Sequence, residues 1–76
     1  MSLYEALLQD INSRFPEKAI LSLEDIAEFL DCPRKSVYQW TKRPDAQKRL
    51  PALVAGKTIR VPKTALVQWL AAGCAD

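Results

Sequence analysis

Two short helical patterns separated by a three-residue break constrain the fold of this chain more than any other feature. Ser22 opens the first pattern as a good N-cap, and Pro33 is well placed to begin the second, which runs to Lys42. Within the break, Asp31 adopts positive φ more readily than most residues other than glycine, as a tight turn between helices requires. The sequence therefore predicts two helices, within residues 22–42, joined by a tight turn.

The second of these helices, Arg34 to Lys42, is predicted to have one apolar face and one polar face. At 100° per residue, Val37 and Trp40 fall on the same side as Pro33. The remaining positions are basic, polar or aromatic, and none is acidic: Lys35, Tyr38, Gln39 and Lys42 lie opposite, with Arg34, Ser36 and Arg43 on the flanks. The helix can therefore pack on a core and present a basic face to solvent.

A β-hairpin is predicted after this helix, because two β-prone runs flank the turn Gly56-Lys57. The register that this turn implies places apolar side chains on one face and leaves Thr58 and Arg60 on the other. Its expected pairs are Val54 with Ile59 and Ala52 with Val61. Residues 43–49, which precede the hairpin, are expected to form a loop.

Further helices are predicted at both ends, at residues 2–15 and 62–72. Ser2 and Glu5 can form a capping box at the first, and Pro62 can begin the last. A strand-like step, Ala19-Ile20-Leu21, separates the first two helices. The expected apolar stripes are Leu3, Tyr4, Leu7, Leu8 and Ile11; Leu23, Ile26, Ala27, Phe29 and Leu30; and Ala65, Leu66, Trp69 and Leu70. The first stripe fits an added core helix, and a dimer or partner surface is the alternative.

The charge of the 76 residues is divided along the chain. Residues 1–31 carry two basic and seven acidic residues, a net charge of −5, whereas residues 32–76 carry nine basic and two acidic residues, a net charge of +7. A basic half in one small domain suggests a face for nucleic acid, and a merely lopsided solvated surface is the alternative.

Several other functions are disfavoured by what the chain contains. There is no histidine, so Tyr38, Ser36 and Cys32 have no plausible general base, and we expect no enzyme, no metal site and no cofactor. Cys32 and Cys74 are expected to be free thiols. No apolar run approaches the length of a membrane span, the N-terminus does not resemble a signal peptide, and a cytoplasmic location is expected.

The predicted order of two helices, a hairpin and a helix is that of a winged helix-turn-helix, mainly α with a small hairpin. Particular residues carry a closer resemblance: Leu23-Glu24-Asp25-Ile26-Ala27-Glu28-Phe29-Leu30, Pro33-Arg34-Lys35-Ser36-Val37-Tyr38-Gln39-Trp40, Leu50-Pro51-Ala52, Gly56, Arg60-Val61-Pro62 and Ala65-Leu66-Val67-Gln68-Trp69-Leu70. On these residues, the segment Leu21 to Leu70 resembles the excisionase-type, AlpA-like branch of the MerR-like winged helix-turn-helix superfamily. The loop from Arg43 to Arg49 is longer than in the plainest members.

We expect one DNA-binding domain over residues 1–76, in which the resemblance implies a helix-turn-helix at 22–42, a wing at 51–61 and a C-terminal helix at 62–72. The extra N-terminal helix at 2–15 lies outside the resemblance. The resemblance implies a protein of a phage or integrative element, most simply an excisionase that bends attachment-site DNA and cooperates with integrase. The alternatives are a small phage-type transcriptional regulator and a protein-interaction module. The implied partners are double-stranded DNA, an integrase and neighbouring copies, with no membrane and no small-molecule substrate.

Candidate DNA-binding residues lie on two predicted elements. Lys35, Ser36 and Gln39 can contact base edges, whereas Arg34, Lys42 and Arg43 are suited to phosphates. Tyr38 can donate its hydroxyl to a phosphate or lie over the helix. The wing contributes Lys57, Thr58 and Arg60, and Lys48, Arg49 and Lys63 are further candidates.

Overall fold

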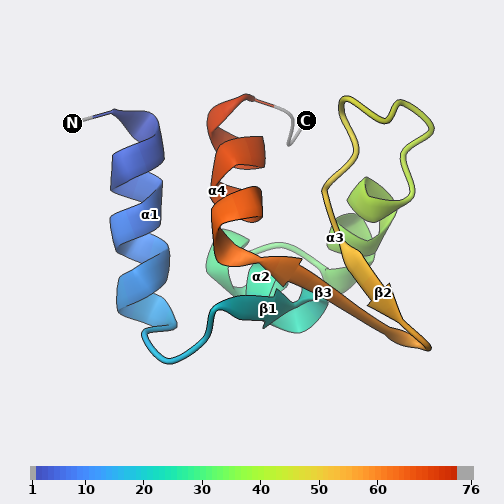
Figure 1. The fold of residues 1–76 in the computed structure, drawn as a ribbon, viewed down its shortest axis with the longest axis horizontal. Coiled ribbons are helices and arrows are strands. Elements are labelled where there is room, and N and C mark those ends of the chain that lie inside the picture. Colours follow the sequence, from blue (N-terminus) through green and yellow to red (C-terminus); the bar gives the residue numbers. More distant parts are fainter. Residues whose placement is uncertain (1, 74–76) are drawn as a thin grey trace.

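The computed structural model describes residues 2–73 and contains four helices and three strands in that part of the chain (Figure 1). In chain order, they are α1 (Leu3–Arg14), β1 (Ile20–Ser22), α2 (Leu23–Leu30), α3 (Arg34–Thr41), β2 (Leu53–Ala55), β3 (Thr58–Pro62) and α4 (Lys63–Ala71). This arrangement confirms the expected fold class, a mainly helical winged helix-turn-helix with an added N-terminal helix.

The turn between α2 and α3 has the local structure that the sequence predicts. Ser22 and Asp25 form a complete capping box at the start of α2. Asp31 ends that helix in the left-handed region with φ of 53°, and its neighbour Cys32 donates its backbone N–H to Ala27 O at 3.0 Å. Pro33 then occupies the N-cap position of α3 with φ of −65°. Left-handed backbone at one residue lets the chain reverse between the helices.

The hairpin belongs to a three-stranded antiparallel sheet in the order β1-β3-β2. The predicted pair Val54 and Ile59 is confirmed, while the ladder begins at Leu53, so that Ala52 lies just outside it. The added strand β1 pairs Leu21 with Val61. The sheet does not bury its apolar face at the tip, where Val54 is 65% exposed.

The core lies between the helices and the inner part of the sheet. Its fully buried side chains are Ile11, Leu21, Ile26, Val37, Leu50, Val61, Leu66 and Val67. Val67 falls outside the predicted stripe of α4, and it is buried because α4 lies between α1 and the rest of the core (Figure 1). The rings of Trp40 and Trp69 pack at 5.3 Å between centroids, and this contact joins α3 to α4.

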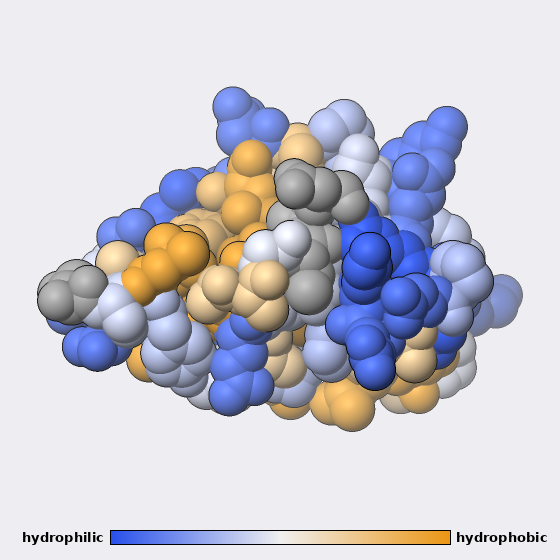
Figure 2. Space-filling view, turned by 90° about the horizontal axis from the view of Figure 1, so that it is seen from above, coloured by the Kyte–Doolittle hydropathy of each residue, from blue (hydrophilic) through white to orange (hydrophobic). Residues whose placement is uncertain are grey.

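The surface differs between the two ends of the molecule. Seen from above, hydrophobic side chains gather over the end that holds α1 and the top of α4, and hydrophilic side chains gather at the opposite end (Figure 2). Leu3 on α1 is 60% exposed, which contributes to the hydrophobic end. The hydrophilic end carries the loop between α3 and β2 (Figures 1 and 2).

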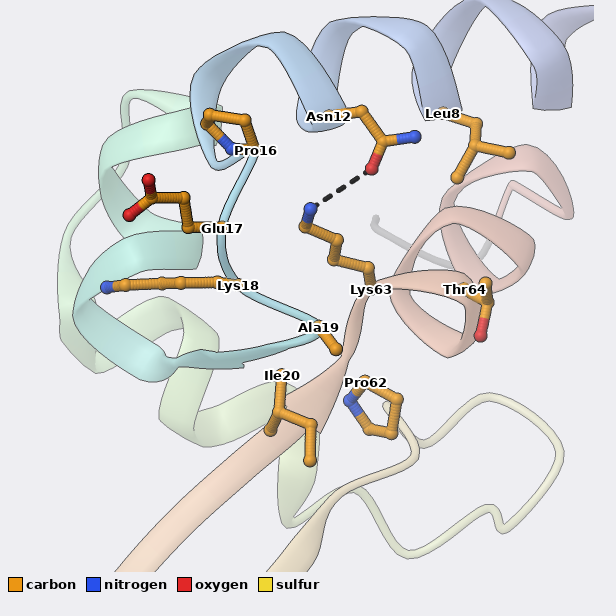
Figure 3. A pocket seen from close by; sticks show the side chains of 10 residues that line it. All are labelled: Leu8, Asn12, Pro16, Glu17, Lys18, Ala19, Ile20, Pro62, Lys63 and Thr64. Carbon is orange, nitrogen blue, oxygen red and sulfur yellow. Dashed lines mark hydrogen bonds between the residues drawn. The ribbon is translucent and has the colours of Figure 1, made fainter.

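The junction between α1 and α4 contains a buried lysine. Lys63 is 8% exposed, and its Nζ donates a 3.0 Å hydrogen bond to Asn12 Oδ1 beside a hollow of about 660 Å³ (Figure 3). Its backbone N–H donates to Ala19 O, which anchors the linker before β1. Lys63 was a further candidate for DNA contact, and that expectation is wrong because the side chain is buried against α1.

Candidate nucleic-acid interface

Helix α3 presents the polar face that its sequence predicts. Lys35, Tyr38, Gln39 and Lys42 are exposed, and Ser36 is half-buried. On the other side, Val37 is fully buried and Trp40 is half-buried against Trp69. Packing by Val37 and Trp40 thus fixes the rotation of α3 about its axis and turns its polar residues outward. Pro33 is exposed, because it caps the helix instead of joining the packed face.

An aromatic contact at the end of α3 positions one of the cations. The Lys42 Nζ lies 5.5 Å from the centroid of the Tyr38 ring, within the range of a cation–π interaction. The Thr41 hydroxyl donates to the Tyr38 carbonyl oxygen at 2.6 Å, which satisfies an acceptor in the last turn. Tyr38 therefore lies under the ammonium group of Lys42, and both side chains extend the exposed face of α3 toward its C-terminus.

The start of α3 and the wing meet around one polar hollow. This hollow, of about 330 Å³, is lined by Ser22, Leu23, Glu24, Arg34, Lys57, Thr58, Ile59 and Arg60. It brings together four candidate residues that the sequence assigned to two separate elements. Three of the four are cations, so the hollow has a positive potential that attracts an anion.

Glu24 moderates that potential at one point. Its Oε1 lies 3.8 Å from Arg34 Nε, but the two side chains are 80% and 59% exposed, respectively. An ion pair this exposed contributes only about 0–1 kcal/mol, since water and salt screen it. Arg34 therefore remains able to exchange this carboxylate for a phosphate oxygen.

Arg43 has a different environment from the other candidates. It is half-buried, its Nη1 donates to Lys48 O at 3.2 Å, and its guanidinium lies 5.7 Å from the Trp69 ring centroid. Arg49 likewise donates from Nε to Arg43 O at 2.6 Å and from Nη2 to Pro44 O at 3.3 Å. Both arginines are thus engaged by the loop backbone. Sequence reasoning missed this role, because a cation in a loop gives no local sign of the carbonyl groups it will contact.

The comparisons with known proteins agree with this geometry. The model of a family described as "Helix-turn-helix domain" matches residues 20–74. The chain belongs to that family. Helix-turn-helix domains of this family bind DNA and are not enzymes, so the exposed face of α3 and the wing belong to a DNA-binding protein. No curated protein and no solved structure matches the chain.

The helix-turn-helix match begins at residue 20 and leaves out the whole of α1, which is therefore an addition to the family's domain. Among residues 2–73, no helix is both long and apolar enough to cross a membrane, and no three His, Cys, Asp or Glu side chains are placed to hold a metal ion. Cys32 is a free thiol, and burial, together with the charge of Asp31, raises its pKa. Cys74 lies outside the described residues.

Proposed function

We propose that this helix-turn-helix protein is an excisionase of the MerR-like, AlpA-like type, acting in the host cytoplasm for a phage or integrative element. In that role it binds and bends attachment-site DNA and assists an integrase. The observation that carries the proposal is the convergence of Arg34 from α3 with Lys57 and Arg60 from the wing around one polar hollow. It supports a surface on which helix and wing engage one duplex together.

In this proposal α3 enters the major groove, where each base pair presents a distinct pattern of hydrogen-bond donors and acceptors. Lys35 and Gln39 contact base edges from the exposed side of the helix, and the half-buried Ser36 contacts them from its flank. Lysine suits guanine and glutamine suits adenine. The sequence assigned Lys42 to phosphate, and its place over Tyr38 at the end of α3 supports that role.

The wing and the start of α3 hold the DNA backbone. Arg34, Lys57 and Arg60 supply charge, and the exposed Thr58 hydroxyl adds a donor beside them. Such contacts set the register of the protein on the duplex but carry little sequence information themselves. Specificity therefore depends on α3, and affinity depends on the whole basic surface.

Fluorescence anisotropy with a labelled duplex tests this surface. If about five cations of this basic surface neutralise phosphates, log K against log salt should have a slope of about −4 to −5. An affinity that does not change between low and moderate salt would rule this surface out as the DNA site.

Footprinting then tests the biological role. An excisionase should protect repeated sites beside the attachment site of the element that encodes it, and the bound fragment should migrate as bent DNA. Protection confined to a promoter, with no site in the attachment region, would replace the excisionase proposal with the transcriptional regulator.

A further inference from the structure

The loop between α3 and β2, residues 43–49, is braced along its whole length. Trp69 Nε1 donates to Lys48 O at 3.0 Å, and Arg49 donates to the carbonyl oxygens of Arg43 and Pro44 at 2.6 and 3.3 Å. Its turn is closed from within, since Lys48 N donates to Asp45 O and Gln47 N donates to Asp45 Oδ1, both at 3.0 Å. These hydrogen bonds connect the two ends of the loop to each other and to Trp69 of α4.

The stability of the folded protein gives only a weak reason for these hydrogen bonds to the loop backbone. Carbonyl groups in an exposed loop are satisfied by water, and ordering a long arginine side chain costs conformational entropy. Yet Pro44, Asp45, Ala46, Gln47, Lys48 and Arg49 are all exposed. The buried anchor is the next residue, Leu50, whose N–H donates to Trp40 O at 3.0 Å. The bracing thus shapes a surface that faces solvent.

The position of the loop indicates what this surface meets. It follows α3 directly, and it projects at the same end of the molecule as the tip of the wing, with α3 between the two (Figure 1). That end is also the hydrophilic one (Figure 2). Residues 42–49 include four cations and one carboxylate, and that carboxylate, Asp45, accepts a hydrogen bond within the turn.

We propose that residues 43–49 form a third DNA-contacting element, beside α3 and the wing, that binds duplex phosphates through the side chains of Lys48 and Gln47. In this assignment Arg49 and Trp69 are positioning residues, because their donors hold the backbone that carries Lys48. The inference rests on the proposed DNA-binding surface and adds to it a contact beyond the C-terminus of the recognition helix.

The experiment measures affinity against salt for Lys48→Ala, Arg49→Ala, Arg49→Lys and Trp69→Phe on a duplex too short to hold a second copy. Arg14→Ala on α1 is the control for loss of one charge, because no neighbouring copy can contact α1 on that duplex. Lys48→Ala should weaken all duplexes about threefold to tenfold and make the salt slope shallower by about 0.9. Arg49→Lys keeps the charge but not the paired donors, so it should lose as much affinity as Arg49→Ala. Arg14→Ala should match the parent protein.

Trp69→Phe removes the indole donor and leaves the charge unchanged. It should weaken binding, and Lys48→Ala added to it should then cost less than twofold, because the two changes act on one contact. Thermal unfolding of each variant separates this effect from damage to the core, and the surface variant Arg49→Lys tests the same bracing without touching the core.

Two results would overturn the inference. Parental affinity in Lys48→Ala, alongside weakened binding in Arg34→Ala and Arg60→Ala, would leave the DNA-binding surface intact and remove the loop from it. Parental affinity in Arg49→Lys but not in Arg49→Ala would make Arg49 a direct phosphate ligand. If the parent protein itself bound duplex without salt dependence, the proposed function would fail first.

Discussion

Lys63 Nζ donates a 3.0 Å hydrogen bond to Asn12 Oδ1, across a separation of 51 residues in the chain. Lys63 opens α4, where a positive charge is unfavourable beside the positive end of the helix dipole. Its side chain is also largely removed from water. The amide of Asn12 compensates part of both costs, and in doing so it ties the added helix α1 to the family's domain.

We expect Asn12→Ala to lower the free energy of unfolding by about 1–3 kcal/mol, because the change leaves a buried ammonium group short of an acceptor. In a Lys63→Met background, which keeps the aliphatic length but removes the charge, Asn12→Ala should cost close to nothing. Urea denaturation of the four proteins measures both values. Equal costs in the two backgrounds would show that Asn12 stabilises α1 by another route.

Residues that contact bases should differ from residues that contact phosphates. Gln39→Ala and Lys35→Ala should each lose about 1–3 kcal/mol on the specific site and relax discrimination there, since each removes a contact to a base edge. Arg60→Ala should weaken specific and random duplexes alike. Gln9→Ala, an exposed polar change on α1, is the control on a one-site duplex, where no neighbouring copy binds. A Gln39→Ala protein that lost equal affinity for specific and random DNA would have no base-reading role at this position.

Asp25 should make the stability of the protein fall in acid. Burial raises the pKa of this carboxyl, but hydrogen bonds from the Lys18 ammonium group and the Ser22 backbone N–H, together with the Ser22 side chain, outweigh burial and lower it. Because the pKa is lower in the folded state, the contribution of Asp25 is complete above its unfolded pKa of about 3.9 and is lost as the pH falls through the folded value.

Urea denaturation between pH 7 and pH 2 measures this loss. Asp25→Asn should lower stability at neutral pH and flatten the curve below about pH 4. Lys18→Met should flatten it only in part, since Ser22 still donates to the carboxylate. If the stability of the parent protein and of Asp25→Asn fell equally as the pH was lowered, this carboxyl would be excluded as a source of the pH dependence.

On DNA, copies of the protein should load cooperatively onto tandem sites. A single module of this size buries only about 600–1,000 Å², too little for tight specific binding alone. We therefore expect a monomer or weak dimer in solution, with neighbours on DNA meeting through α1 or the acidic first half of the chain. Sedimentation of the free protein and titration of one-site and two-site duplexes measure this. A tight dimer without DNA, with no gain from tandem sites, would favour a repressor on a palindrome.

Local features were predictable from the sequence, because a few adjacent residues determine them. The capping box at Ser22, the left-handed Asp31 and the pairing of Val54 with Ile59 all depend on short-range backbone chemistry. The two faces of α3 follow from helical periodicity alone, and so the exposure of Lys35 and Gln39 was predictable too. Whether these side chains contact DNA stays a prediction.

Features that depend on contacts distant in the sequence were not predictable in this way. The pairing of β1 with β3 joins two segments that are distant in the chain, and nothing in either segment indicates the other as its partner. The sequence predicted only a strand-like step at residues 19–21. The burial of Lys63 depends on where α1 packs. The convergence of Arg34 with the wing and the bracing by Arg49 depend on the assembled fold in the same way.

Strand β3 also determines when the protein can function during its synthesis. It is the central strand, and it pairs with β1, which precedes it by about forty residues. A ribosome therefore releases the whole of α2 and α3 before β3, which pairs with β1 and β2 and contacts α2, has emerged. A nascent or truncated chain that ends before Thr58 contains α3 but lacks the central strand of the sheet. We therefore expect DNA binding to begin only when β3 and α4 have been translated and the domain folds as one unit.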